Sequence, residues 1–212
     1  MKPLRLRNLK YILLFILSIT AGALGVHGQG NYLLLINGDS LYLDLNNPIE
    51  FVTSDGNRLN LELLQPMILT YSDEMVSFNH SKQFSVSNTV VENGIEQCMI
   101  INSTGNGFMV QKYSTMDPSM LIPLMVNELT KESVSYGYIK TERDVRRKLM
   151  SGEEIKGIEA TLSYRGVNEV YTVYAWGGKD EGILVVTMLL SEDYAEVDGP
   201  LIELFLKTLR IH

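Results

Sequence analysis

The sequence predicts an α+β fold: an antiparallel sheet flanked by helices on both faces, preceded by a small N-terminal β-meander. Short β-favouring runs separated by turn signals such as Asn-Gly and Asp-Gly occupy much of the chain after residue 30. Two stretches, 118–132 and 198–208, carry apolar residues at helical spacing. One run, 183–190, is apolar on both faces of a strand and therefore needs cover on each side.

The first 28 residues have the pattern of an export signal. Four basic residues and no acidic one accompany the apolar run 11–20, and small residues follow through Gly28. We expect cleavage after Gly28 and a periplasmic or secreted protein. The alternative is a single N-terminal membrane anchor, although the apolar stretch 11–26 spans 16 residues and a spanning helix needs about 20. Contact with a membrane is expected only in that second case.

The chain beyond residue 28 is acidic. Removal of residues 1–28 changes the formal net charge from −7 to −11, because this segment holds four of the 18 basic residues and none of the 25 acidic ones. An acidic surface repels phosphate backbones, so nucleic-acid binding is not expected. Cys98 is the only cysteine and lies in an apolar run, which indicates a buried small side chain and excludes an internal disulfide.

Residues 29–65 are predicted to form the N-terminal β-meander extension, and residues 66–212 the main α+β domain. β-Favouring runs at 32–36, 41–45, 50–53 and 59–63 alternate with turn-forming residues, which is typical of a meander. Gln65 and Pro66 mark the predicted boundary.

Further strands are expected before the first helix, at 68–71, 76–78, 83–87, 95–102 and 108–113. Asp117 and Pro118 then have the residue types of an N-cap and a first helical position. Helix 118–132 follows. Pro123 lacks a backbone donor and predicts a kinked or 3₁₀ start to this helix.

The C-terminal third predicts a three-stranded meander closed by a helix. Apolar and polar residues alternate along 158–165, and tight turns lead to strands 170–176 and 183–190. The last of these strands is expected to be central and the most buried of the fold. Asp198 and Pro200 mark the predicted start of the terminal helix.

This order of elements resembles the PsbP-like fold family. The resemblance rests on the strand GIEATLSY from Gly157, the two antiparallel strands after it, and the final helix ending in FLKTLRI. Upstream, VSFNHSKQFSVS from Val76 resembles the family's opening strand pair, and GFMVQKY from Gly107 resembles its strand before the first helix. The family includes the extrinsic photosystem II subunit, the Ran-binding Mog proteins and the periplasmic DcrB type. The resemblance covers roughly residues 67–212, implies the fold, and carries over no functional residue.

The motifs tested for chemistry give no catalytic or metal site, and no cofactor is predicted. His80 and His212 are the only histidines beyond residue 28, too few beside one cysteine for a typical zinc site. The chain contains no nucleophile elbow, P-loop, dinucleotide fingerprint or calcium loop. Ser40, within Asp-Ser-Leu in a predicted turn, resembles a short bacterial O-glycosylation motif and is a candidate modification site.

Tyrosines and one tryptophan are the enrichment of functional interest. Tyr136 and Tyr138 follow the first predicted helix, and Trp176 lies at the mouth of a glycine-rich loop. Trp176 shares a strand face with Tyr174, and Tyr164 is expected across from that face. These rings either pack against a helix or line a groove for a partner or ligand. Tyr136, Tyr138 and Trp176 are therefore the candidate binding residues.

These observations favour a non-enzymatic accessory or interaction module of a cell-envelope protein assembly, with an envelope protein as its partner. The alternative is a periplasmic carrier of a small ligand, with a pocket between the sheet and helix 118–132. An enzyme ranks third, because no catalytic constellation is recognised. A flat exposed aromatic patch favours the module, and a large apolar pocket with converging polar groups favours the carrier.

Overall fold

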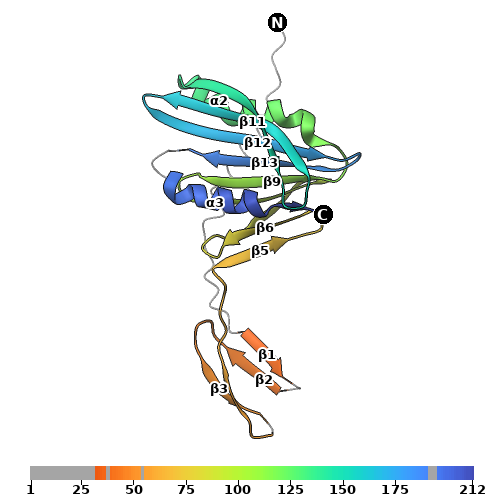
Figure 1. The fold of residues 1–212 in the computed structure, drawn as a ribbon, viewed down its shortest axis with the longest axis vertical. Coiled ribbons are helices and arrows are strands. Elements are labelled where there is room, and N and C mark those ends of the chain that lie inside the picture. The colour runs from red at the N-terminus through yellow and green to blue at the C-terminus, as the bar shows by residue number, and fades with distance from the viewer. Residues whose placement is uncertain (1–31, 37–38, 54, 191–194) are drawn as a thin grey trace. The chain divides into compact units, whose positions relative to one another are not determined.

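The computed structural model describes residues 32–36, 39–53, 55–190 and 195–212. The chain divides into two compact units, Met1–Gln65 and Pro66–His212 (Figure 1). The predicted signal, residues 1–28, lies outside the described residues. Within the described ranges, no helix combines the length and apolar character needed to cross a membrane.

The described residues of the N-terminal unit form two separate β-hairpins. Strand β1 (Tyr32–Ile36) pairs with β2 (Asp39–Leu43), and β3 (Ile49–Val52) pairs with β4 (Arg58–Leu61). The prediction of a single meander is therefore wrong, because β2 and β3 belong to different sheets. After β2 the chain turns through Asn46, at φ 60°, whose N–H donates to the carbonyl of Leu63 beyond β4.

A seven-stranded antiparallel sheet organises the second unit. Its strand order is β10-β11-β12-β13-β9-β8-β7, so β13 is the central strand, as the sequence predicts. Figure 1 shows β11, β12, β13 and β9 side by side. The strands are β7 (Ser87–Glu92), β8 (Ile95–Ile101), β9 (Gly107–Tyr113), β10 (Ile139–Lys148), β11 (Glu154–Tyr164), β12 (Val167–Gly177) and β13 (Gly182–Leu189).

A smaller sheet and the helices complete the second unit. Strands β5 (Ile68–Ser72), β6 (Val76–Ser81) and β14 (Arg210–Ile211) form a three-stranded sheet in the order β14-β6-β5. A 3₁₀ helix, η1 (Pro118–Leu121), leads into α2 (Ile122–Ser135), and α3 (Ala195–Thr208) precedes β14. The unit is thus α+β, mostly antiparallel strand with two α-helices.

The first helical segment begins as its sequence predicts. The Asp117 carboxylate accepts a hydrogen bond from the Ser119 N–H at 2.8 Å, and Pro118 opens η1. Pro123 stands in the first turn of α2, where its missing N–H breaks no helical hydrogen bond, and the 3₁₀ segment precedes it. The helix then continues to Ser135, past the predicted end at residue 132.

Two predicted boundaries are wrong. Residues 83–86 are not a strand; the chain turns there, and Phe84 and Val86 pack against a buried cluster instead of pairing with a neighbouring strand. Helix α3 begins at Ala195 and contains Pro200, so Asp198 is not its cap. The Asp198 carboxylate instead accepts a hydrogen bond from the Asn106 amide at 2.7 Å, which holds the loop before β9 against the helix.

The most buried strand is β9, and the expectation for β13 is wrong on this point. All seven residues of β9 are buried, whereas β13 ends in two half-buried residues. The sequence conceals this burial because β9 contains Gln111 and Lys112. Gln111 donates its amide to Gln97 at 3.0 Å, so this buried polar group has a partner.

Two apolar clusters form around the central strand. The first cluster contains Ile183 and Val185 of β13 together with Phe205 of α3. The second cluster contains Leu184 of β13 together with Val126 of α2. Because successive residues of a strand point to opposite faces of a sheet, the two clusters lie on opposite faces of β13. Cys98 is fully buried in the first cluster, as its apolar surroundings predict.

Candidate functional site

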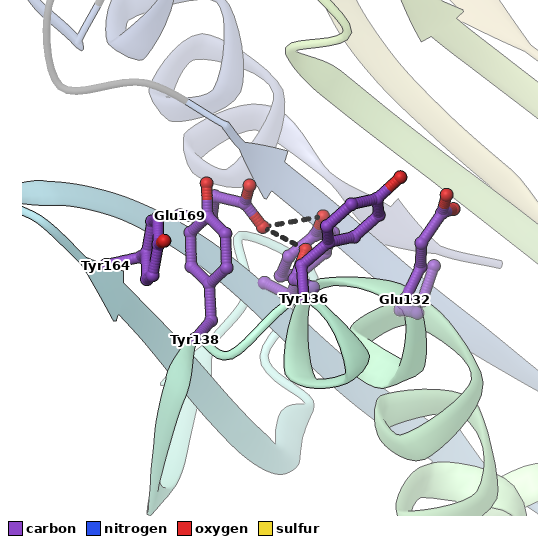
Figure 2. A pocket seen from close by; sticks show the side chains of 8 residues that line it. Glu132, Tyr136, Tyr138, Tyr164 and Glu169 are labelled. Atoms are coloured by element: carbon purple, nitrogen blue, oxygen red, sulfur yellow. Dashed lines mark hydrogen bonds between the residues drawn. The ribbon is translucent and has the colours of Figure 1, made fainter.

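A recess in the second unit lies between the C-terminal end of α2 and strands β11 and β12. Its volume is about 440 Å³. Figure 2 shows side chains from the helix end and from the strands converging on it. We call this site the tyrosine recess, and its lining residues are Leu129, Glu132, Ser133, Tyr136, Tyr138, Tyr164, Glu169 and Tyr171.

The end of α2 positions two of the tyrosines. Gly137 follows the helix at a φ of 100°, a backbone conformation that favours glycine. Its N–H donates to the Val134 carbonyl at 3.0 Å, and the Tyr138 N–H donates to the Ser133 carbonyl at 3.1 Å. These two bonds form the Schellman motif, which reverses the chain at a helix end. Tyr136 therefore sits at the helix end, and Tyr138 follows the reversal.

The hairpin of β11 and β12 forms the opposite wall. Arg165 and Gly166 have φ values of 52° and 84°, which is the geometry of a tight two-residue turn. Tyr164 immediately precedes this turn. Glu169 and Tyr171 lie two residues apart on β12 and so share one face of the sheet. Tyr171 belongs to the second cluster, which means that the recess is the outer margin of that apolar core.

Glu169 is the polar centre of the tyrosine recess. Its Oε2 atom accepts hydrogen bonds from the Ser133 hydroxyl at 2.7 Å and the Tyr171 hydroxyl at 3.4 Å, drawn as dashed lines in Figure 2. Burial, and then the charge of Glu169, raises the pKa of Tyr171. The same two causes raise the pKa of Tyr138. Both hydroxyls therefore remain protonated donors at neutral pH.

The rings of the recess differ in how firmly they are held. Tyr138 and Tyr164 stack with their centroids 5.2 Å apart and their planes inclined by 29°. The Arg165 guanidinium carbon lies 5.0 Å from the centroid of the Tyr164 ring. Tyr136 stands apart from this pair and is 74 % exposed. The site thus presents a stacked pair of rings and one exposed ring around a carboxylate.

Charge in the lining is negative only. Glu132 and Glu169 are carboxylates, and the other six lining residues are neutral. Such a lining attracts a cation or a hydrogen-bond donor and repels a phosphate or a carboxylate. The charge of the lining therefore favours a cationic or hydrogen-bond-donating ligand group over an anionic one.

The structure brings two of the three predicted binding residues together. Tyr136 and Tyr138 both line the recess. Trp176 does not; it packs against the first cluster, on the opposite face of β12 from Tyr171. Tyr164 does not lie across from Trp176 either. The hairpin register places it at the other end of β12, where it stacks on Tyr138.

Sequence reasoning misses Ser133 and Glu169. Both are polar residues at the edges of elements, and nothing local to either one indicates a site. The usable signal is the spacing of Glu169 and Tyr171, which in a strand places a carboxylate and a ring on one face. Their approach to Ser133 depends on how α2 packs on the sheet, which no short window of sequence contains.

Two other candidate residues, Ser40 and His80, are not among the residues that line the recess. Ser40 lies in β2 rather than in a turn, and its side chain is outside the described residues. His80 is buried, and its Nδ1 lies 3.0 Å from the Ser81 carbonyl oxygen. Across the described ranges, no group of three or more His, Cys, Asp or Glu side chains is arranged to hold a metal ion.

A larger groove, of about 620 Å³, lies beside Lys112. Lys112 binds Asp73 at 2.7 Å and Glu96 at 2.8 Å, and its side chain is 8 % exposed. The charge of this lysine is therefore already matched by the protein itself. The ion pairs connect β9 to β8 and to the turn between β5 and β6, which is a structural role.

Comparison with family models gives no match for this chain, and comparison with curated proteins gives none. The tyrosine recess brings aromatic rings, a carboxylate and an accessible opening together.

Proposed function

We propose that this protein is an exported, non-enzymatic interaction module of a cell-envelope assembly, and that the tyrosine recess is its docking surface. The observation that carries the proposal is that the exposed ring of Tyr136 lines the same recess as the stacked pair Tyr138 and Tyr164. Tyrosine rings bury a large area at low entropic cost, which is why they are frequent at binding hot spots. Export and an envelope partner are inferred from the basic and apolar pattern of residues 1–28.

We also propose a PsbP-like scaffold, with one helix on each face of the seven-stranded sheet. Alternate residues of β13 enter two clusters, one containing α3 residues and the other an α2 residue, which supports this arrangement. The order of strands and helices from residue 67 onward supports the same scaffold. A scaffold does not specify an activity, so the function depends on the recess.

Site-specific photo-crosslinking tests the docking role. A photoreactive phenylalanine analogue replaces Tyr136 in one variant and Met120 in the control, because Met120 is 79 % exposed in η1 and does not line the recess. In envelope fractions we expect a discrete protein adduct from position 136 and none from position 120. Equal yields at the two positions, or no adduct at position 136 in a protein of unchanged Tm, contradict the proposal.

A carrier of a small ligand is the second candidate. The recess lies between α2 and the sheet, and its volume falls in the range of about 300–1,000 Å³ that is usual for ligand pockets. The exposure of Tyr136 favours the module, because such pockets enclose most of the ligand's surface. Native mass spectrometry of the purified protein separates the two functions, since a carrier is expected to retain a small molecule at one equivalent.

A further inference from the structure

We infer that the tyrosine recess accepts an alkylammonium group, and that this group is a lysine side chain of the protein partner. The inference rests on the interaction module proposed above and adds the chemistry of the residue that docks. Its starting point is the pairing of two carboxylates, Glu132 and Glu169, with four tyrosine rings in one opening.

The recess attracts a cation by two independent means. The carboxylates supply charge, and the faces of tyrosine rings supply the negative side of a quadrupole. One of these rings already contacts a cation of the chain itself, because the Arg165 guanidinium carbon lies 5.0 Å from the centroid of the Tyr164 ring. Among the described residues, none that lines the recess is basic, so no lining side chain neutralises Glu132 or Glu169.

The hydrogen bonds of Glu169 favour an ammonium over a guanidinium. Its Oε2 atom already accepts from the hydroxyls of Ser133 and Tyr171. An arginine fork binds best when both carboxylate oxygens are open to parallel hydrogen bonds. An ammonium is a compact point charge and needs a single oxygen. The four methylenes of a lysine also pack well along ring faces while the charged head reaches the carboxylate.

The openness of the site favours a lysine on a protein surface over a free small cation. Tyr136 borders the recess and is 74 % exposed, so this side of the recess is not enclosed. A docking protein surface covers the open side, whereas a free cation leaves it wet. The formal net charge of −7 for the whole chain adds long-range attraction for a basic partner.

A nuclear magnetic resonance titration of the full chain tests the chemistry directly. The probe is n-butylammonium chloride, which mimics a lysine side chain, and 1-butanol is the matched uncharged compound, both at constant ionic strength. We expect saturable shifts of the Tyr138 and Tyr171 ring signals with butylammonium, and binding of butanol at least tenfold weaker. No saturable shift, or equal affinity for the two compounds, overturns the inference.

Matched variants locate the interaction in the recess. Glu169→Gln keeps an oxygen acceptor for Ser133 and Tyr171 and is expected to weaken butylammonium binding at least tenfold. The control is Glu128→Gln, which also removes one negative charge but lies on α2 outside the recess lining. It is expected to leave butylammonium binding unchanged. If Glu169→Gln does not fold, Tyr138→Leu against Tyr138→Phe serves instead, because only the second keeps a ring. Equal binding by the paired variants overturns the inference.

Choline distinguishes the source of the cation. A preference of tenfold or more for choline over butylammonium assigns the recess to a free quaternary ammonium compound and overturns the lysine. The crosslink from position 136 keeps the two proposals separate. If position 136 gives an adduct but butylammonium does not bind, the docking role stands and the lysine is contradicted. If butylammonium binds but position 136 gives no adduct, both the docking role and the partner's lysine are contradicted.

Discussion

The two faces of the seven-stranded sheet use aromatic rings in different ways. On the first-cluster face, Phe108 and Phe205 stack with centroids 3.8 Å apart, and Phe78 meets both rings edge-on. All three are buried. On the other face, Tyr138 and Tyr164 stack at 5.2 Å beside a carboxylate at the margin of the second cluster. Ring stacking alone therefore does not distinguish a core from a site; burial and polar partners do.

The hydroxyl group explains the difference. A phenylalanine ring has no polar atom and packs into a closed core without further requirement. A tyrosine hydroxyl needs water or a hydrogen-bond partner, so tyrosines collect where a core meets the surface. Tyr171 shows the limit of this position: it is 8 % exposed, and its hydroxyl reaches Glu169.

A charge on the first-cluster face is expected to have the largest effect. Val185 is fully buried on β13, so Val185→Asp places an unpaired carboxylate among apolar side chains. We expect the free energy of unfolding to fall by at least about 5 kcal/mol, or no folded protein. Thermal denaturation followed by circular dichroism measures the effect, and an unchanged Tm removes Val185 from the core.

Truncation of one ring on each face of the sheet compares how much stability the two kinds of ring contribute. Phe205→Ala removes a fully buried ring that stacks on Phe108, and we expect a loss of about 3–4 kcal/mol. Tyr138→Ala removes a half-buried ring, and we expect a loss of about 1 kcal/mol. Urea denaturation of the two variants checks the ratio. Similar losses in the free energy of unfolding would mean that Tyr138 is a core residue and that the rings on the two faces have the same role.

Acid is expected to weaken the first-cluster side of the unit. Burial opposes ionisation of Asp73 and Asp198, but hydrogen bonds, led by those from Lys112 and Asn106 respectively, hold both pKa values below the usual 3.8. A lowered folded-state pKa stabilises the fold above the usual value, and this contribution is lost as pH falls through the folded-state value. We expect a level Tm above about pH 5 and a decline below about pH 4. The decline is expected to be shallower in Asp198→Asn, and an identical profile contradicts this assignment.

The smallest expected change in stability is a gain at the turn beside the recess. Arg165 has a φ of 52°, a conformation that asparagine adopts more easily before glycine in a two-residue hairpin turn. We expect Arg165→Asn to raise the free energy of unfolding by about 0.5 kcal/mol. A loss of stability in urea denaturation instead means that the contact of the guanidinium with Tyr164 outweighs the backbone strain.

Local chemistry predicts the centre of the fold well. The run 183–190 is apolar on both faces, and β13 is indeed the middle strand between two clusters. Asp117 and Pro118 have the residue types of a helix start, and a capping hydrogen bond forms there. These features depend on neighbours within a few residues, which is the range over which sequence patterns are informative.

The edges of the sheet are where prediction fails. The sequence does not predict strand β10, because its charged residues leave no continuous apolar face. Its arginines form ion pairs: Arg143 with Glu159 at 2.7 Å and Arg147 with Glu203 at 2.9 Å. All six residues of β7, at the other edge, are exposed. Charged and exposed edge strands prevent pairing with other chains, so their sequences resemble those of loops.

The candidate site is predicted in part. Tyr136 and Tyr138 are identified from their position after a helix, and both line the recess. Trp176, the third predicted binding residue, lies outside the recess and packs against the first cluster, because strand parity places it on the other face of the sheet. Glu169 is missed, because its role depends on the packing of α2 against β12.

The most direct test of the account is partner capture by Tyr136→Ala. Tyr136 is 74 % exposed, so its loss is expected to leave the Tm unchanged, and Met120→Ala is the matched control at an equally exposed position outside the recess. With the crosslinked partner as bait, we expect Tyr136→Ala to weaken capture by at least about 1 kcal/mol, roughly fivefold, and Met120→Ala to have no effect. Capture by Tyr136→Ala equal to that of the unaltered protein would contradict the claim that the tyrosine recess is the docking surface.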